Sequence, residues 1–189
     1  MSKRMIIACT IAGLALSPAF AQHPTTPAQA DVAKQSYQPF EWLIGDWDSP
    51  GGANETIHQR LRFGPDRAYI TNSTYIGRVG GAEQLHFEGI MVWNGRTEML
   101  DYVFAVAPGS GIQEKGTIRV EVDGLVVREV ELTDAKGAVT NFRQTFRSTG
   151  KDSAVTSLMR QGANGWQPNF PGSDRIEMRR RAASSGEHG

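Results

Sequence analysis

The sequence predicts an all-β protein whose strands form one up-and-down antiparallel β-barrel. From Glu55 onward, segments of about ten residues alternate with clusters of Gly, Pro, Asp and Asn, which is the spacing of hairpin-connected strands and not of βαβ units. Apolar and polar residues alternate within these segments, so each strand has one face for a core. A meander of about ten strands avoids exposed edges most simply by closing on itself.

The expected strands follow one another with connections of hairpin length. Asn94-Gly95 and Asp123-Gly124 are the strongest turn signals, because a two-residue type I′ turn requires positive φ at both positions. After a short strand that opens at Trp47, the expected strands are 55–63, 67–76, 83–93, 97–106, 112–122, 125–133, 139–148, 153–161 and 175–181.

An apolar segment, Phe40-Glu41-Trp42-Leu43-Ile44-Gly45-Asp46-Trp47, precedes the first strand. We interpret it as a short N-terminal plug. Gly45 would let the chain reverse, and the large Trp47 ring would close one end of a barrel whose interior must be filled or occupied by a ligand. The barrel domain, with its plug, is expected to span residues 39–181.

Residues 1–21 have the pattern of a secretory signal peptide. Two basic residues precede an apolar run, and Ala19-Phe20-Ala21 matches a small-residue cleavage site. The run is shorter than the roughly 20 apolar residues that span a bilayer. We therefore expect cleavage near Ala21, a periplasmic or secreted protein, and no stable membrane insertion.

The segments that flank the barrel domain are polar and poor in large apolar residues. Residues 22–38 are expected to be a flexible linker, helical at most at its end. Residues 182–189 are small and polar without periodicity, which predicts a disordered tail.

Composition excludes several functional classes. The 20 basic and 20 acidic side chains balance, and this balance argues against nucleic-acid binding. The one cysteine, Cys9, would leave with the signal peptide, so neither a disulfide nor a thiolate metal site is expected. A core of this length can bury roughly 70% of its unfolded surface and does not need disulfides.

Polar residues that interrupt apolar rows are the main candidates for ligand contacts. Tyr102, Gln144 and Arg160 each share a row with apolar residues, and a buried polar group costs several kcal/mol unless it is paired. A pocket that keeps such groups pairs them with each other, with water or with a ligand; alternatively, Tyr102 and Arg160 reach the rim. The expected ligand-binding residues, with Trp93 at the rim, are Phe87, Met91, Trp93, Tyr102, Phe104, Phe142, Gln144 and Arg160.

Candidates for catalysis are His86, Glu88 and Tyr102. A histidine oriented by a carboxylate can act as a general base near neutral pH. If Phe87 and Met91 face inward, however, His86 and Glu88 face water, unless a β-bulge before His86 changes the register. No spacing of ligands suggests a metal site, so none is expected.

The Gly45-Asp46-Trp47 element, the meander and the basic last strand together resemble the lipocalin-like (calycin) barrels. The chain is similar to small secreted bacterial lipocalin-like proteins that begin with Trp-Leu-x-Gly-x-Trp. This resemblance implies that Trp47 packs against an arginine of the last strand, Arg179 or Arg180, a structural contact of roughly 0.5–2 kcal/mol.

A weaker similarity connects Leu85-His86-Phe87-Glu88-Gly89 to the nitrobindin-type heme barrels. Those proteins ligate heme through a histidine near the carboxyl end of the barrel. Here the histidine in that region is His188, in the expected tail. We therefore expect no heme and no other cofactor.

These observations leave three functional hypotheses. The first is a binding protein that holds a small hydrophobic molecule in the barrel. The second is an enzyme of isomerase, lyase or hydratase type that acts on a hydrophobic substrate in the same pocket. The third is a barrel filled by its own side chains that serves as an interaction module, which predicts no cavity. Oligomeric state is left open.

Overall fold

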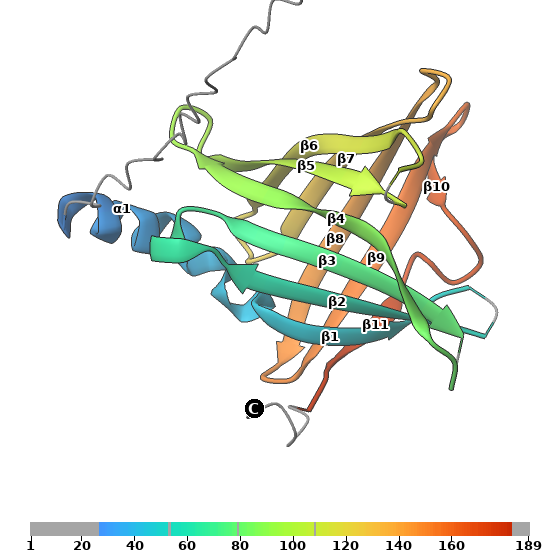
Figure 1. Ribbon diagram of the computed structural model, residues 1–189, viewed down its shortest axis with the longest axis horizontal. Coiled ribbons are helices and arrows are strands. Elements are labelled where there is room, and N and C mark those ends of the chain that lie inside the picture. Colours follow the sequence, from blue (N-terminus) through green and yellow to red (C-terminus); the bar gives the residue numbers. More distant parts are fainter. Residues whose placement is uncertain (1–26, 53, 79, 108, 183–189) are drawn as a thin grey trace, which may run out of the picture.

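The computed structural model describes residues 27–182 except 53, 79 and 108. They form a closed antiparallel β-barrel of ten strands, with one extra strand and a short α-helix near the N-terminus (Figure 1). The predicted fold class is confirmed. The predicted signal peptide, residues 1–21, and nearly all of the predicted tail lie outside the described residues.

Eleven strands and three short helices make up the described chain. The helices are α1 (Pro27–Tyr37), η1 (Gln38–Leu43) and η2 (Pro65–Arg67). The barrel strands are β1 (Gly45–Pro50), β2 (Glu55–Phe63), β3 (Ile70–Arg78), β4 (Glu83–Asn94), β5 (Met99–Val106), β6 (Ile112–Val120), β7 (Val126–Thr133), β8 (Val139–Gly150), β9 (Ser153–Gly162) and β11 (Ile176–Arg180). The extra strand is β10 (Gly165–Pro168).

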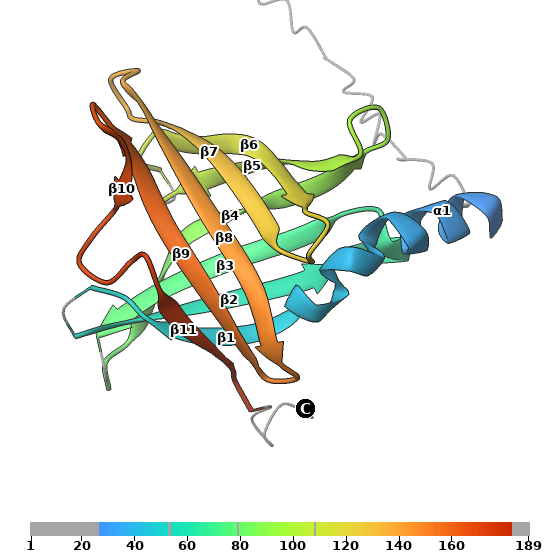
Figure 2. The ribbon, with the colours of Figure 1, turned by 180° about the vertical axis from the view of Figure 1, so that it is seen from behind.

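The strands pair in chain order, as a meander requires. Each strand from β1 to β8 pairs with the next one, and the barrel closes because β11 pairs with both β9 and β1. Figure 2, which views the barrel from behind, shows β9, β11 and β1 side by side on the face nearest the reader. The extra strand β10 pairs with β9 next to the mouth of the barrel, through partners such as Trp166 and Gln161.

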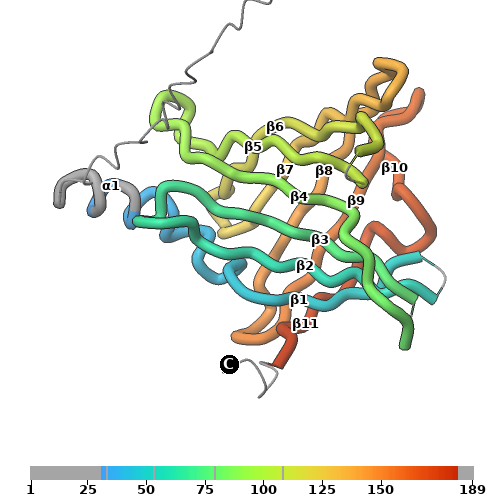
Figure 3. The backbone as a smooth tube through the Cα atoms, in the orientation of Figure 1, coloured from blue at the N-terminus to red at the C-terminus, as the bar shows by residue number. Residues whose placement is uncertain are grey.

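The segment before β1 closes one end of the barrel, at the left in Figure 3. The part of the expected flexible linker 22–38 that the structure describes is helical from Pro27 to Tyr37. Tyr37 is buried, and its hydroxyl donates to the Ala68 carbonyl at 3.1 Å and accepts from the Trp93 N–H at 2.9 Å. This segment is ordered because tertiary contacts hold it, although its sequence has no amphipathic pattern.

The predicted plug is held by Trp47 and Arg180. Indole Nε1 donates to the Leu43 carbonyl at 2.8 Å, and the Arg180 guanidinium lies 4.3 Å from the centre of the ring. Arg180 also donates to the carbonyls of Trp42 and Ile44. Gly45 has φ of 136°, and a Cβ at this position would collide with the guanidinium. The chain therefore reverses here only with glycine.

Two turns differ from their predicted type I′ geometry. The β4–β5 loop comprises four residues, and Glu98 rather than Gly95 has positive φ. In the β6–β7 loop only Gly124 of the predicted pair has positive φ. Side chains explain both cases, because Asn94 Oδ1 accepts from the Arg96 N–H and Asp123 Oδ1 accepts from the Leu125 N–H, which favours longer turns.

Between β10 and β11 a loop, rather than a strand, completes the wall of the barrel. The Leu158 N–H donates to the Ser173 carbonyl, and the Leu158 carbonyl accepts from the Asn169 N–H and the Ser173 hydroxyl. Ser173 is fully buried. No helix in the described part of the chain is long and apolar enough to cross a membrane.

Candidate functional site

The half of the barrel that lies away from α1 contains a cavity of about 250 Å³. Its walls come from the inward rows of β1 to β9 and β11, together with Asn169 and Phe170 of the β10–β11 loop. The apolar part of its lining includes Ile57, Ile76, Phe87, Phe104, Leu132 and Phe142. For comparison, an apolar cavity of about 150 Å³ holds benzene, so this cavity has room for a small organic molecule.

A chain of polar side chains crosses the cavity. Arg128 Nη2 donates to the Glu114 carboxylate, and Arg128 Nη1 donates to Gln144 Oε1 at 3.1 Å. Gln144 Nε2 then donates to Thr156 Oγ1 at 3.3 Å. Arg128 and Glu114 are both buried, at 8% and 6% exposure. We call Glu114, Arg128, Gln144 and Thr156 the interior polar chain.

Strand register brings these groups together. Arg128 lies directly opposite Gln144 in the β7–β8 ladder. In the neighbouring β6–β7 ladder Gly116 lies opposite Val130, between the levels of Glu114 and Ile118. A Cβ at Gly116 would collide with the Glu129 carbonyl oxygen and would lie 3.1 Å from the Tyr102 ring, so only glycine fits beside this ring.

Aromatic rings also stabilise the guanidinium. Arg128 lies 4.7 Å from the ring centre of Tyr102 and 5.1 Å from that of Phe104, a favourable geometry for a cation. Burial alone would lower the pKa of Arg128, but the charge of Glu114 raises it overall. Burial also raises the pKa of Tyr102 to about 12. Arg128 is therefore charged and Tyr102 is neutral at physiological pH.

Arg128 separates this cavity from the filled half of the barrel. A residual space of about 30 Å³ lies on the α1 side of its side chain. Met91, Leu100 and residues of η1 surround that space. The Arg128 side chain therefore lies at the boundary between the two spaces. It forms the floor of the cavity on one side and borders the filled core on the other.

The predicted ligand-binding residues divide into two groups. Phe87, Phe104, Phe142 and Gln144 line the cavity. The four that the structure places elsewhere are Met91, Trp93, Tyr102 and Arg160.

Each of these four positions has a structural reason. Met91 lies in the filled half, and Trp93 lies at the α1 end, so it is not at the open rim. Tyr102 is buried under Arg128 instead of reaching the rim. Arg160 is exposed, because its row extends past Leu158 to a level where β9 pairs with β10.

The three candidate catalytic residues are not brought together. A bulge in the β3–β4 ladder occurs at His86, but it moves Leu85, not Glu88, to the other face. Glu88 lies on the outer surface 3.4 Å from the Ser73 hydroxyl, whereas Tyr102 is inside the barrel. The His86 ring packs against Phe87. His86 and Glu88 therefore form no acid–base pair with Tyr102.

Sequence reasoning missed Glu114 and Arg128. In the segment 125–133, Val126 and Val127 are both apolar, so alternation does not show which row faces inward. The row Val126, Arg128 and Val130 proves to be the inner one. The available signal was Arg128 itself, a charged residue in the same row as Val126 and Val130.

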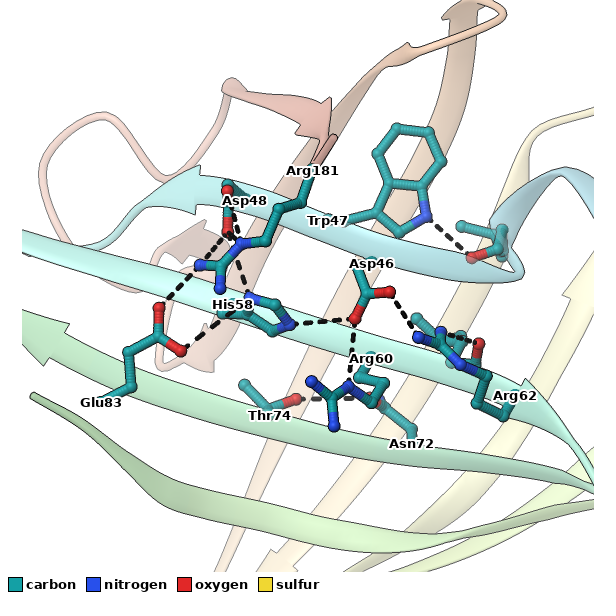
Figure 4. Close-up of polar contacts among 12 residues, drawn as sticks. Asp46, Trp47, Asp48, His58, Arg60, Arg62, Asn72, Thr74, Glu83 and Arg181 are labelled. Atoms are coloured by element: carbon teal, nitrogen blue, oxygen red, sulfur yellow. Dashed lines mark hydrogen bonds and ion pairs between the residues drawn. The ribbon is translucent and has the colours of Figure 1, made fainter. Parts of the chain in front are cut away.

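A second polar cluster lies outside the barrel, on β1 and β2 (Figure 4). Its centre is His58, which is only 2% exposed. His58 Nε2 lies 3.1 Å from Asp46 Oδ1, and Nδ1 lies 3.4 Å from Asp48 Oδ1. We call this group, with the arginines that surround it, the outer cluster.

Arginines neutralise the carboxylates of the outer cluster. Arg181 donates to Asp48 and to Glu83, both at 2.7 Å, and Arg60 and Arg62 donate to Asp46. Partial burial raises the pKa of Asp46, but hydrogen bonds and charge from the two arginines lower it overall. The carboxylates of Asp48 and Glu83 raise the pKa of Arg181.

The outer cluster connects segments that are distant in sequence. It joins β1, β2, the start of β4 and the residue that follows β11. Among the described residues, no three or more His, Cys, Asp or Glu side chains are placed to hold a metal ion. We interpret the cluster as a set of ion pairs that stabilises the barrel where β1 and β11 close it.

A wider hollow of about 600 Å³ lies on the outer face of the sheet beside Trp166. Its charged side chains are paired with one another, as in Lys115 with Glu131 at 2.8 Å and Arg143 with Glu129 at 2.9 Å. Arg143 also lies 4.9 Å from the Trp166 ring. The interior cavity lies inside the barrel and has a mostly apolar lining, so it is the better candidate site.

Comparison with known proteins identifies no family for the chain. No model of a known protein family matches it, and no curated protein matches it.

Proposed function

We propose that this protein binds a small, largely apolar molecule in the interior cavity. The observation that carries the proposal is the combination of an open apolar space with buried polar groups on its floor. Such a combination is typical of ligand sites, where apolar walls provide affinity and a few polar groups fix orientation. A barrel that served only as a scaffold would be more stable with this space filled.

The resemblance to lipocalin-like barrels supports the same proposal. The closed ten-stranded barrel is compatible with that fold, and the Arg180–Trp47 contact is the kind that the resemblance implies. We propose membership of the lipocalin-like group, and action in the periplasm or outside the cell after export.

The alternative proposal, an enzyme of isomerase, lyase or hydratase type, has less support. It requires a titratable group that faces the substrate with a suitable proton affinity. In the cavity the charged groups are Glu114 and Arg128, which neutralise each other. His86 would have to turn into the lumen to contribute.

The first experiment is native mass spectrometry of the protein purified without denaturation, followed by extraction of any bound molecule. In parallel, the neutral fluorescent probe N-phenyl-1-naphthylamine is titrated into the protein. We expect saturable binding of one probe per chain.

A matched pair of variants shows where the probe binds. Leu132 lines the cavity and Val103 is 58% exposed on the outer face. Leu132→Trp should weaken probe binding at least tenfold because the indole occupies the cavity, and Val103→Trp should leave it unchanged. No probe binding, or equal binding by both folded variants, would contradict the proposal.

A further inference from the structure

The interior polar chain determines which kind of ligand headgroup the cavity can accept. We infer that the cavity selects a neutral amphiphile with a hydroxyl group over a free carboxylic acid of the same length. This inference rests on the proposed function and concerns the same site. It follows from how the charges of Glu114 and Arg128 are already used.

The charge of Arg128 is already balanced inside the barrel by Glu114. Its Nη2 donates to Glu114 and its Nη1 donates to Gln144. The remaining nitrogen, Nε, is buried and has no hydrogen-bond partner among the described residues, so it is closed off from the cavity. One side of the guanidinium lies against the rings of Tyr102 and Phe104, whose centres are 5.1 Å apart. Each Nη has one further N–H, but Glu114 balances the charge, so a ligand carboxylate would find no uncompensated cation at the floor.

Glu114, by contrast, offers an acceptor to the cavity. It is part of the cavity lining, and its pairing with Arg128 uses Oε2. A ligand hydroxyl could donate to Oε1, and the Thr156 hydroxyl, which already accepts from Gln144, could donate to the ligand oxygen. A hydroxyl is both a donor and an acceptor and matches this pair.

The net charge of the floor leads to the same conclusion. Glu114 and Arg128 cancel, so an anion that enters the cavity loses its hydration without gaining a counter-charge. A neutral hydroxyl loses much less. Arg160 is exposed at the mouth, and an ion pair in water adds little affinity there.

Two ligands of equal chain length test the inference on the unmodified protein. Bound N-phenyl-1-naphthylamine is displaced with 1-octanol or with octanoate at pH 7.5, where the acid is ionised. We expect 1-octanol to displace the probe at a concentration at least tenfold lower than octanoate. Equal or better displacement by octanoate overturns the inference, and so does the absence of displacement by 1-octanol.

The outcomes separate this inference from the proposed function. If the probe itself fails to bind, the proposed function fails and the inference falls with it. If octanoate displaces the probe as well as 1-octanol does, the pocket exists but its selectivity is not the one inferred. Loss of octanoate binding in Arg160→Gln would then place the acid at the mouth.

Glu114→Gln provides a second test, because it leaves Arg128 without its anionic partner. The ratio of the two displacement concentrations should then shift at least tenfold towards octanoate. Glu131→Gln removes a carboxylate from the outer face, where Glu131 pairs with Lys115, and should leave the ratio unchanged. An unchanged ratio in folded Glu114→Gln contradicts the inference. If this variant does not fold, the comparison on the unmodified protein still decides.

Discussion

The two halves of the barrel share the same strands but differ in what fills them. At the α1 end, Tyr37, Phe40, Leu43 and Trp47 are all buried and leave about 30 Å³ of space. At the other end about 250 Å³ is open. The difference comes from the N-terminal segment, which supplies large side chains to one end only. Stability is therefore expected to depend on the filled half, and binding on the open half.

The boundary between the two halves provides the largest expected effect. Arg128→Met removes the partner of a buried carboxylate and should lower the free energy of unfolding by about 3–5 kcal/mol. The double variant Glu114→Gln with Arg128→Met should recover most of this loss, because no unpaired charge remains. Urea titration followed by circular dichroism measures both. Equal losses of unfolding free energy in the single and the double variant would contradict this prediction, because the loss would then not come from the unpaired charge of Glu114.

Truncating a leucine in each half tests the comparison directly. Leu100 is 1% exposed in the filled half, and Leu132 lines the open cavity. Leu100→Ala should cost about 3 kcal/mol, because it creates a new cavity in a packed core. Leu132→Ala should cost less than about 1.5 kcal/mol, because fewer contacts are lost. Similar costs would mean that the two halves are packed alike.

The plug can be tested with neighbouring arginines of β11. Arg180→Met removes the stacking on Trp47 and the hydrogen bonds to two carbonyls, and should cost about 2 kcal/mol. Arg179 is exposed, so Arg179→Met should change stability by less than about 0.5 kcal/mol. Thermal unfolding of both variants checks this, and a larger loss for Arg179→Met would contradict the assignment.

The outer cluster should contribute least and should show a pH dependence. Because the arginines lower the pKa of Asp46, its carboxylate stabilises the fold above the unfolded pKa of about 3.9, and this contribution is lost as pH falls through the lower folded pKa. Asp46→Asn should therefore destabilise the protein by less than about 1 kcal/mol at pH 7. The difference should vanish as the pH falls through the lowered pKa of folded Asp46, as measured by urea titration over a series of acidic pH values. A difference that grows as the pH falls would reverse the sign of the argument.

The features that were predictable from sequence are those that depend on local patterns. Alternation and turn residues gave the antiparallel meander, and the Trp47 segment gave the closed end. The helix Pro27–Tyr37 could not be predicted from local patterns. Its sequence has no amphipathic pattern, and tertiary contacts of Tyr37 stabilise it.

The site was predictable only in part, for the same physical reason. Phe87, Phe104, Phe142 and Gln144 follow from alternation, and they do line the cavity. Arg160 is exposed. The choice between a ligand contact and a rim position was not predictable for it, because alternation gives the face of a strand but not the level at which the cavity ends. Pairing across strands, which unites Glu114 with Arg128, depends on register and is not visible in one sequence.

Hydrogen bonds join the wall of the barrel unevenly. In β9, Thr156 pairs with Ile176 of β11, and Met159 pairs with Pro168 of β10. Between them, Leu158 forms hydrogen bonds with Ser173 and Asn169 of the β10–β11 loop. Elsewhere paired strands form the wall, with register shifts in the β3–β4 and β8–β9 ladders. Separating the loop from β9 at this point would break the three hydrogen bonds of Leu158 to Ser173 and Asn169, but no strand pair. If the cavity binds a ligand as we propose, we expect exchange at this side of the barrel to depend on those three hydrogen bonds.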